Sequence, residues 1–227
     1  MSSISILPFG DSLTSGFHNR GMSSHPYSMI LNIKLQESFP KMGFDCEHKG
    51  VPGERATNMS KRLKLLLKKK SYDYIIILAG TNDMAFTDDP QEIINSLEEL
   101  YQIVQKQKKK KFFKKNVQTQ LIVVTIPERS ADQNYEKKKN QKKEINNWIR
   151  GYQQKNQSFC HLYDLFQEVP YSGIDEDLQK KIWDDGLHFK PYGYDLFGKG
   201  LAKLFTQILE GTNQNNVKKK KKKKKKK

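Results

Sequence analysis

Four short polar motifs in this 227-residue sequence contain residue types that can act together in nucleophilic catalysis. They are Gly10-Asp11-Ser12-Leu13-Thr14, Gly50-Val51-Pro52-Gly53-Glu54-Arg55, Gly80-Thr81-Asn82-Asp83 and Asp184-Asp185-Gly186-Leu187-His188. Taken singly, each motif is more typical of a turn or a helix cap than of a catalytic site. Their occurrence together, in this order, favours a shared chemical function.

The pair that suggests nucleophilic catalysis is Ser12 and His188. A serine hydroxyl is a weak nucleophile near neutral pH, so it needs a base, and histidine is the side chain whose ordinary pKa suits that task. A carboxylate must also hold the imidazole in one tautomer. Asp185, three residues before His188, can return towards the ring through a turn that Gly186 permits.

The other motifs contain groups that can stabilise the negative oxygen of a tetrahedral intermediate. The candidate oxyanion donors are the backbone N–H groups of Ser12 and Gly53 and the side-chain amide of Asn82. Asn82 could instead be an ordinary turn or cap residue. The candidate supporting residues within the same motifs are Gly10, Asp11, Gly80 and Asp83.

The elements that must position these motifs are short β-rich runs that alternate with longer segments of helical period. Strands are predicted over residues 4–9, 44–49, 72–79, 120–126 and 159–163, and apolar stripes predict helices over residues 93–104, 145–152 and 197–208. This alternation favours a parallel sheet with helices on both faces. Three motifs directly follow the first three strands, and the fourth precedes a helix that starts near Pro191. All four are therefore expected in one crevice at the carboxyl edge of the sheet.

The motifs resemble the blocks of the SGNH (GDSL-type) hydrolase family. Leu7-Pro8-Phe9 and the first motif are similar to the block with the nucleophilic serine, and the second motif is similar to the block whose later glycine donates to the oxyanion. The third and fourth motifs resemble the Gly-x-Asn-Asp and Asp-x-x-His blocks, and the choice of Asp185 over Asp184 follows from that spacing. The resemblance covers residues 4–209.

This resemblance implies a three-layer α/β/α sandwich of flavodoxin-like type with a five-stranded parallel sheet. It also implies hydrolysis of small-molecule esters or thioesters by a Ser12–His188–Asp185 triad, with no metal and no cofactor. Substrates in the family include short-chain esters, lysophospholipids, thioesters and acetylated sugars, and the sequence does not select among them. Phe86, Tyr171 and Trp183 could line the crevice or be ordinary packing residues. One departure is Glu54-Arg55, where many members have Asp-Thr or a similar pair.

The strong positive charge raises a second hypothesis, a non-catalytic basic protein that binds through its lysine clusters. The formal net charge is +16, but ten lysines form the run 218–227, which leaves +6 for the rest. The remaining clusters at 68–70, 106–115 and 137–143 have no regularly spaced aromatic residues among them. We therefore interpret them as solvated helix ends and loops and expect no specific nucleic-acid partner. The cluster at 106–115 is predicted to be a helix end followed by a loop.

We expect one hydrolase domain over residues 1–210 and a disordered lysine-rich tail over residues 211–227, because like charges repel one another and bury nothing. No signal-peptide pattern and no stretch of 18 apolar residues is found, so a cytoplasmic protein without a transmembrane segment is expected. Cys46 and Cys160 are predicted to be reduced core residues. The sequence does not indicate an oligomeric state.

Overall fold

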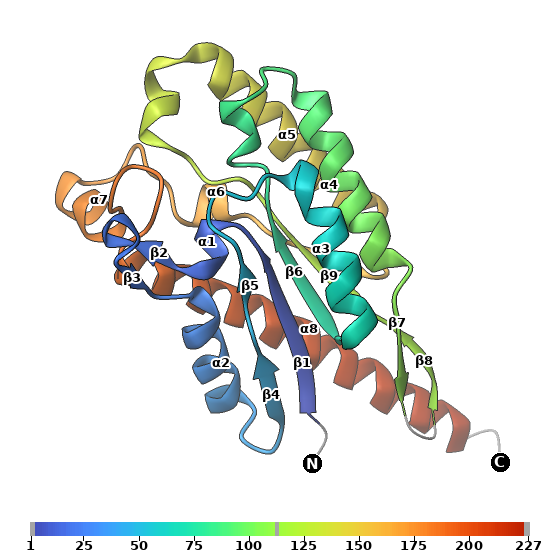
Figure 1. Cartoon of the computed structure of the whole chain (residues 1–227). Helices are drawn as coiled ribbons and strands as arrows, with labels where there is room; N and C mark the ends of the chain where they lie inside the picture. The colour runs from blue at the N-terminus through green and yellow to red at the C-terminus, as the bar shows by residue number, and fades with distance from the viewer. Residues whose placement is uncertain (1–2, 112–113, 225–227) are drawn as a thin grey trace.

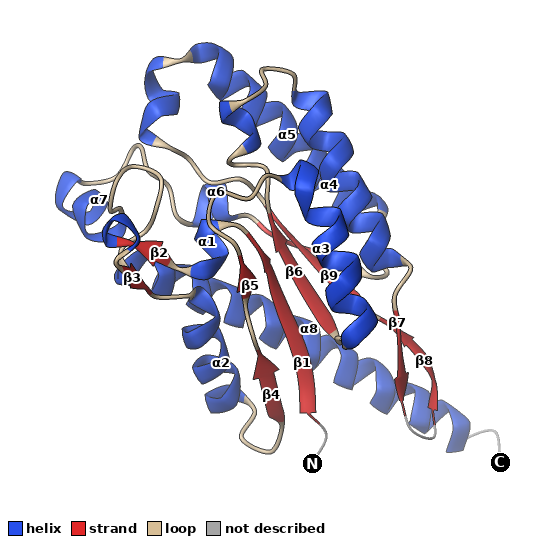
Figure 2. Ribbon diagram, viewed as in Figure 1, coloured by secondary structure: helices blue, strands red, loops and turns tan. Residues whose placement is uncertain are grey.

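A six-stranded sheet forms the centre of the protein (Figures 1 and 2). The computed structural model describes residues 3–111 and 114–224, the side chains of 108–116 and 212–224 excepted. The strand order is β10-β9-β6-β1-β4, with the short β5 also paired to β1, and all pairs are parallel. The strands are β1 (Ser3–Gly10), β4 (Gly43–Cys46), β5 (Lys49–Gly50), β6 (Tyr74–Leu78), β9 (Gln120–Val124) and β10 (Cys160–Tyr163).

Helices cover both faces of the sheet, which confirms the predicted three-layer α/β/α sandwich. One face carries α3 (Ala56–Lys69), α4 (Pro90–Gln105) and α5 (Glu136–Lys155), and the other carries α2 (Tyr27–Ser38), α6 (Leu165–Glu168), α7 (Glu176–Ile182) and α8 (Pro191–Lys224). Figure 1 shows α3 and α4 on one side of the sheet and α2 and α8 on the other. None of the helices in the described ranges has the length and apolar character needed to cross a membrane.

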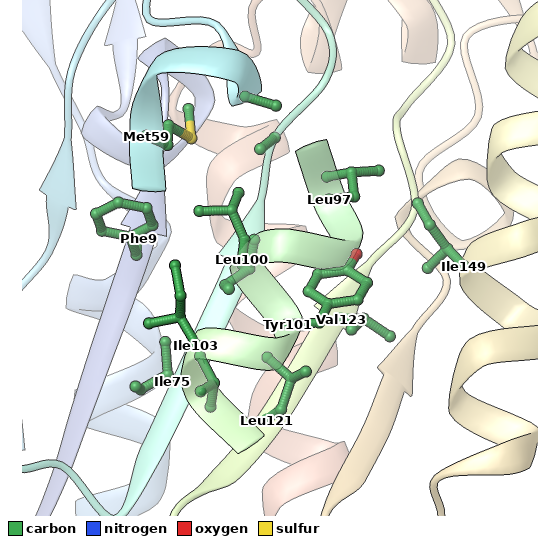
Figure 3. Close-up of a cluster of buried hydrophobic side chains, with 14 of the residues drawn as sticks. Phe9, Met59, Ile75, Leu97, Leu100, Tyr101, Ile103, Leu121, Val123 and Ile149 are labelled. Atoms are coloured by element: carbon green, nitrogen blue, oxygen red, sulfur yellow. The ribbon is translucent and has the colours of Figure 1, made fainter. Parts of the chain in front are cut away.

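The layered packing follows from the alternation of side chains along each strand. In β6, Ile75 and Ile77 belong to one apolar cluster, whereas Ile76 and Leu78 belong to the other. All five residues of β6 are buried, as expected of a central parallel strand. Figure 3 shows the first of these clusters, where α4 places Leu97, Leu100 and Tyr101 over the strands.

The strand order reverses between β1 and β6, because β1 pairs with β4 on one side and β6 on the other. In a doubly wound sheet, the loops that leave the two strands at such a reversal diverge and open a crevice at the carboxyl edge. The loops after β1 and β6 carry the first and third polar motifs.

Two local expectations need correction. The predicted strand 44–49 is divided into β4 and β5, separated by Glu47 and His48. The cluster 106–115 does not form a helix end and a loop, because α4 ends at Gln105 and β7 (Lys108–Lys111) pairs with β8 (Lys114–Gln118) in an antiparallel hairpin. This hairpin is held by backbone pairing, and a run of lysines has no alternation of apolar and polar residues. The sequence therefore contained no signal for the hairpin.

Three further features complete the chain. The short elements of the chain are α1 (Ser12–Ser15), β2 (Phe17–His18), η1 (Asn19–Gly21), β3 (Ser23–Ser24), η2 (Asp83–Ala85) and η3 (Ser130–Asn134). Cys46 and Cys160 are both free thiols, and Cys160 is buried. Helix α8 continues to Lys224, beyond residue 210, where the sequence predicts the end of the hydrolase domain. The division at residues 210 and 211 stays a prediction.

Candidate active site

The first motif forms the turn that presents Ser12 at the carboxyl end of β1. Gly10 ends the strand, and a side chain there would collide with the carbonyl oxygen of Leu78 on β6. Asp11 caps α1, since its Oδ1 accepts the N–H of Leu13 at 3.0 Å. Ser12 thus occupies the first position of a helix, where the backbone N–H has no acceptor within the helix.

The fourth motif brings His188 and Asp185 to this serine. Nε2 of His188 lies 2.9 Å from Oγ of Ser12, and Nδ1 lies 2.8 Å from Oδ2 of Asp185. The second oxygen of Asp185 accepts the backbone N–H groups of Leu187 at 3.0 Å and His188 at 2.8 Å. Asp184 has a different partner, because its Oδ2 accepts the N–H of Asn19 at 2.7 Å. Asp185, Ser12 and His188 therefore form an unbroken hydrogen-bond chain.

A small hairpin, β2–β3, supports the loop that holds His188. The ring of Phe17 lies 4.5 Å from the His188 ring, measured between centroids. The hydroxyl of Tyr194 donates to the Phe17 carbonyl at 2.7 Å, which ties the hairpin to α8. Gly186 has φ = +77°, and its carbonyl accepts the N–H of Ser130 at 2.8 Å. Sequence reasoning missed the hairpin, because two-residue strands have no detectable period.

The second and third motifs lie side by side and contribute Gly53 and Asn82. Gly53 has φ = +76° and open space around its Cα, and among the described residues no acceptor meets its N–H. The Nδ2 of Asn82 donates to the carbonyl of Glu54 at 3.0 Å. An amide nitrogen carries two N–H groups, so this contact leaves one for a ligand. The structure thus brings the proposed oxyanion donors onto two adjoining loops.

Buried Asp83 connects these two loops. Its carboxylate accepts the N–H groups of Ala56 at 2.8 Å and Thr57 at 3.3 Å, and so caps the amino end of α3. Its side chain is buried, which makes the two charge-assisted bonds costly to lose. Gly80, which begins this motif, has φ = +103°, and a side chain there would press on Ile126. Asp83 and Gly80 therefore support the loop geometry.

Arg62 of α3 connects the same loops to the sheet. Its guanidinium pairs with the carboxylate of Glu54 and donates to the carbonyls of Gly10 at 3.0 Å and Lys49 at 2.7 Å. It also lies 4.0 Å from the centre of the Phe9 ring. Arg62 could not be selected from the other basic residues by sequence, since the fold brings the Gly10 and Lys49 carbonyls to its guanidinium.

Comparison with known proteins places this geometry in a family. The family model described as "GDSL-like Lipase/Acylhydrolase family" matches residues 9–196, which include all four motifs. The chain belongs to this family. As a GDSL-like hydrolase, it acts on ester bonds. Among curated proteins, no sequence matches the chain.

Solved structures share the fold of this GDSL-like hydrolase at low sequence identity. A lipolytic protein of the G-D-S-L family from Veillonella parvula is 17% identical with a TM-score of 0.67, covering 89% of this chain and 98% of its own. A putative arylesterase from Agrobacterium tumefaciens is 20% identical with a TM-score of 0.69, covering 90% and 99%. The inhibitor-bound aryl esterase of M. smegmatis is 19% identical with a TM-score of 0.67, covering 90% and 99%.

Two carboxyl groups in the site of this GDSL-like hydrolase have shifted pKa values of opposite sign. Burial raises the pKa of Asp11 to about 7, against the bond from the Leu13 N–H, and its Oδ2 has no partner among the described residues. Burial also acts to raise the pKa of Asp185, but bonds from the backbone and ring of His188 outweigh it and keep the pKa below the ordinary value. Asp185 is therefore held as a carboxylate.

The remaining candidates differ in their surroundings. Trp183 is buried against Tyr171 and Phe189, so it is a packing residue, whereas Phe86 is 72% exposed beside the third motif. In the described part of this GDSL-like hydrolase, no three His, Cys, Asp or Glu side chains are grouped so that they could hold a metal ion.

Proposed function

We propose that this hydrolase is a serine esterase in which Ser12 is the nucleophile, His188 the base and Asp185 the orienting carboxylate. The observation that carries the proposal is the hydrogen-bond chain from Asp185 Oδ2 through the His188 ring to Ser12 Oγ. Such a chain lets a histidine remove the serine proton near neutral pH while a carboxylate stabilises the imidazolium.

In the acylation step, Oγ of Ser12 attacks the ester carbonyl carbon and its proton passes to Nε2 of His188. The bond between Nδ1 and Asp185 keeps Nε2 free to accept that proton. The tetrahedral intermediate then collapses, the bond to the alcohol oxygen breaks, and His188 returns the proton to the leaving alcohol. The acyl group remains on Ser12 as an ester.

The developing oxyanion is stabilised by the backbone N–H groups of Ser12 and Gly53 and by the free N–H of Asn82. This role is supported by the N–H groups of Ser12 and Gly53, which have no acceptor in the described part of the chain, and by the hydrogen bond from Asn82 to the Glu54 carbonyl. Donors that are already oriented need no reorganisation when the charge appears. Gly10, Asp11, Gly80 and Asp83 support these positions without contacting the substrate.

Deacylation repeats the sequence with water as the nucleophile. His188 removes a proton from the water, the water oxygen attacks the acyl carbon, and the Ser12 oxygen leaves with the proton from His188. Acid and free serine are the products. The proposed chemistry needs no cofactor, and its substrates are small-molecule carboxylic esters, with thioesters and lysophospholipids as further candidates.

The decisive test is Ser12→Ala, measured with p-nitrophenyl esters of increasing acyl length. We expect kcat to fall by about 10⁴-fold or more, since loss of a triad member typically has this effect. Ser96→Ala is the matched control, because Ser96 donates to the carbonyl of Glu92 within α4. Retention of more than a few per cent of wild-type turnover by folded Ser12→Ala would show that Ser12 is not the nucleophile.

A further inference from the structure

Three arginines contact the loops of the second and third motifs, and two of them have carboxylate partners. Arg62 pairs with Glu54, and Arg129, whose Nη1 lies 3.5 Å from the Thr81 carbonyl, pairs with Asp132. Arg55 differs, because within the described ranges its side chain forms neither an ion pair nor a hydrogen bond. A cation of this kind is available to a ligand.

The Arg55 side chain contacts the ring of Phe86, with 4.6 Å from the guanidinium carbon to the ring centre. An arginine that stacks on an aromatic ring uses the face of its guanidinium, so its N–H groups at the edge stay free. These edge groups form the planar fork that matches a carboxylate or a phosphate. Phe86 is 72% exposed, so the pair lies at the protein surface.

The Arg55–Phe86 pair adjoins the proposed oxyanion donors. Arg55 is two residues after Gly53, and an extended chain spans at most about 3.6 Å per residue, so their Cα atoms are at most about 7 Å apart. Phe86 follows the Asn82 motif directly and donates its N–H to the Asp83 carbonyl at 2.8 Å. Arg55 and Phe86 therefore belong to the same two loops as the proposed oxyanion donors Gly53 and Asn82.

The nearby carboxylates are already engaged and leave the Arg55 charge uncompensated. Glu54 is paired with Arg62, and Asp83 accepts two backbone N–H groups at the start of α3. The departure of Glu54-Arg55 from the common family pair thus has two parts. Glu54 pairs with Arg62, which connects the loop to the sheet, and Arg55 is left as a cation beside the oxyanion site.

Building on the proposed esterase activity, we propose that Arg55 binds an anionic group of the substrate. The enzyme then favours esters that carry a carboxylate or phosphate a few bonds from the scissile carbonyl. Phe86 is a positioning residue that holds the guanidinium over this side of the crevice. The charged group is bound on the acyl side or on the alcohol side of the ester.

Two matched substrate pairs separate these sides. For the acyl side, the mono-p-nitrophenyl ester of glutaric acid is compared with p-nitrophenyl pentanoate, which has the same chain length without the charge. For the alcohol side, p-acetoxybenzoate is compared with its neutral methyl ester. The measured quantity is the ratio of kcat/KM for the charged ester to kcat/KM for the neutral one. A general effect on folding or on the oxyanion site changes both values and cancels in the ratio.

In Arg55→Gln we expect this ratio to fall about tenfold for at least one pair, the size typical of one charge-assisted hydrogen bond at a partly exposed site. Arg55→Lys should restore part of it, because a lysine keeps the charge but lacks the planar fork. Added salt should lower the wild-type ratio and leave the Arg55→Gln ratio nearly constant. The control is Lys61→Gln, which makes the same charge change at an exposed position of α3.

The outcomes distinguish the two proposals. An equal ratio in the wild type and Arg55→Gln for both pairs, with Ser12-dependent turnover intact, would overturn the anion site and leave the esterase proposal standing. An equal fall in Lys61→Gln would assign the effect to the overall positive charge and would also overturn the site. If the wild type hydrolyses none of the four esters, both the esterase proposal and the anion-site proposal are wrong.

Discussion

The two halves of the candidate site are built in different ways. On the base side, Ser12, His188 and Asp185 contact one another through side chains, and both carboxylate oxygens of Asp185 are occupied. On the oxyanion side, the N–H of Gly53 and one N–H of Asn82 have no acceptor among the described residues. Hydrogen bonds made by Asp83 and Arg62 hold these loops in place. On the base side the side chains of the triad are hydrogen-bonded to one another, whereas the oxyanion side has free N–H donors.

This difference shows where each half gets its geometry. On the base side the reacting groups contact one another directly, and the β2–β3 hairpin supports the loop that holds His188. The oxyanion side is ordered by residues outside the reaction, chiefly buried Asp83 at the start of α3. Free donors held by a separate framework are what a site needs to bind charge that appears only in the transition state.

The largest effect on the oxyanion side is expected from Asn82→Ala. It should lower kcat by roughly 10²- to 10³-fold with little change in KM, because the lost contact strengthens only in the transition state. The measurement is kcat together with the urea midpoint on one preparation. Asn95→Ala, which removes an exposed amide of α4, is the control. A destabilised Asn82→Ala with full turnover per folded molecule would make Asn82 a turn residue only.

The base side should determine the pH dependence of the rate. We expect kcat/KM to rise with pH between pH 5 and pH 8, because only neutral imidazole accepts the Ser12 proton. The pKa of Asp185 lies below its ordinary value, so this carboxylate stays ionised throughout that range. The profile is measured from pH 5 to 8 with chemistry shown to be rate-limiting. A flat profile would contradict the role of His188.

A smaller effect concerns Asp11, the buried residue between the two halves. Burial raises its pKa to about 7, so folding favours the protonated form. Its stabilising contribution is complete below the unfolded pKa of about 4 and is lost as the pH rises through 7. Asp11→Asn stays uncharged and can still cap α1. The free energy of unfolding of Asp11→Asn, relative to that of the wild type, should therefore rise by about 1 to 3 kcal/mol between pH 5 and pH 8.

Urea unfolding of both proteins at the two pH values measures the Asp11 effect. The control is Asp175→Asn, an exposed cap of α7 whose Oδ1 accepts the N–H groups of Asp177 and Leu178. The same pH-dependent gain in Asp175→Asn would assign the effect to net charge. No gain in Asp11→Asn would show that Asp11 is ionised in the folded protein across this range.

The smallest effect is expected from removal of residues 211–227. We propose that residues 1–210 form the complete hydrolase domain, because all four motifs and both apolar clusters lie before residue 211. The shortened chain should keep its kcat and its urea midpoint, and lose salt-dependent retention on an anionic matrix. A fall in either kcat or stability would show that the end of α8 contributes to the domain.

Much of the fold could be predicted because its signals are local. The run Tyr74-Ile75-Ile76-Ile77-Leu78 is apolar at every position, which indicates a central parallel strand, and the helical stripes of α4, α5 and α8 were equally clear. The short hairpins were not predictable, since β2–β3 and β7–β8 depend on backbone pairing rather than on side-chain period.

The candidate site likewise contains residues that could be predicted from the sequence and residues that could not. Ser12, His188, Gly53 and Asn82 could be selected from the sequence because each chemical task needs a particular residue type and each motif adjoins a predicted element. Spacing alone did not separate Asp185 from Asp184, and it was the resemblance to the family that favoured Asp185. In the structure Asp185 faces the imidazole, whereas Asp184 meets the Asn19 N–H.

The sequence by itself determined the order of strands and helices and the motifs at their ends, because both depend on neighbours in the chain. Only the tertiary structure decided that Arg62 would pair with Glu54, that Phe17 would pack on His188, and that Arg55 would lie on Phe86 with no carboxylate partner among the described residues. The physical reason is that these contacts join residues brought together by strand order and helix packing. A residue type indicates what a side chain can do, and the fold decides which partner it meets.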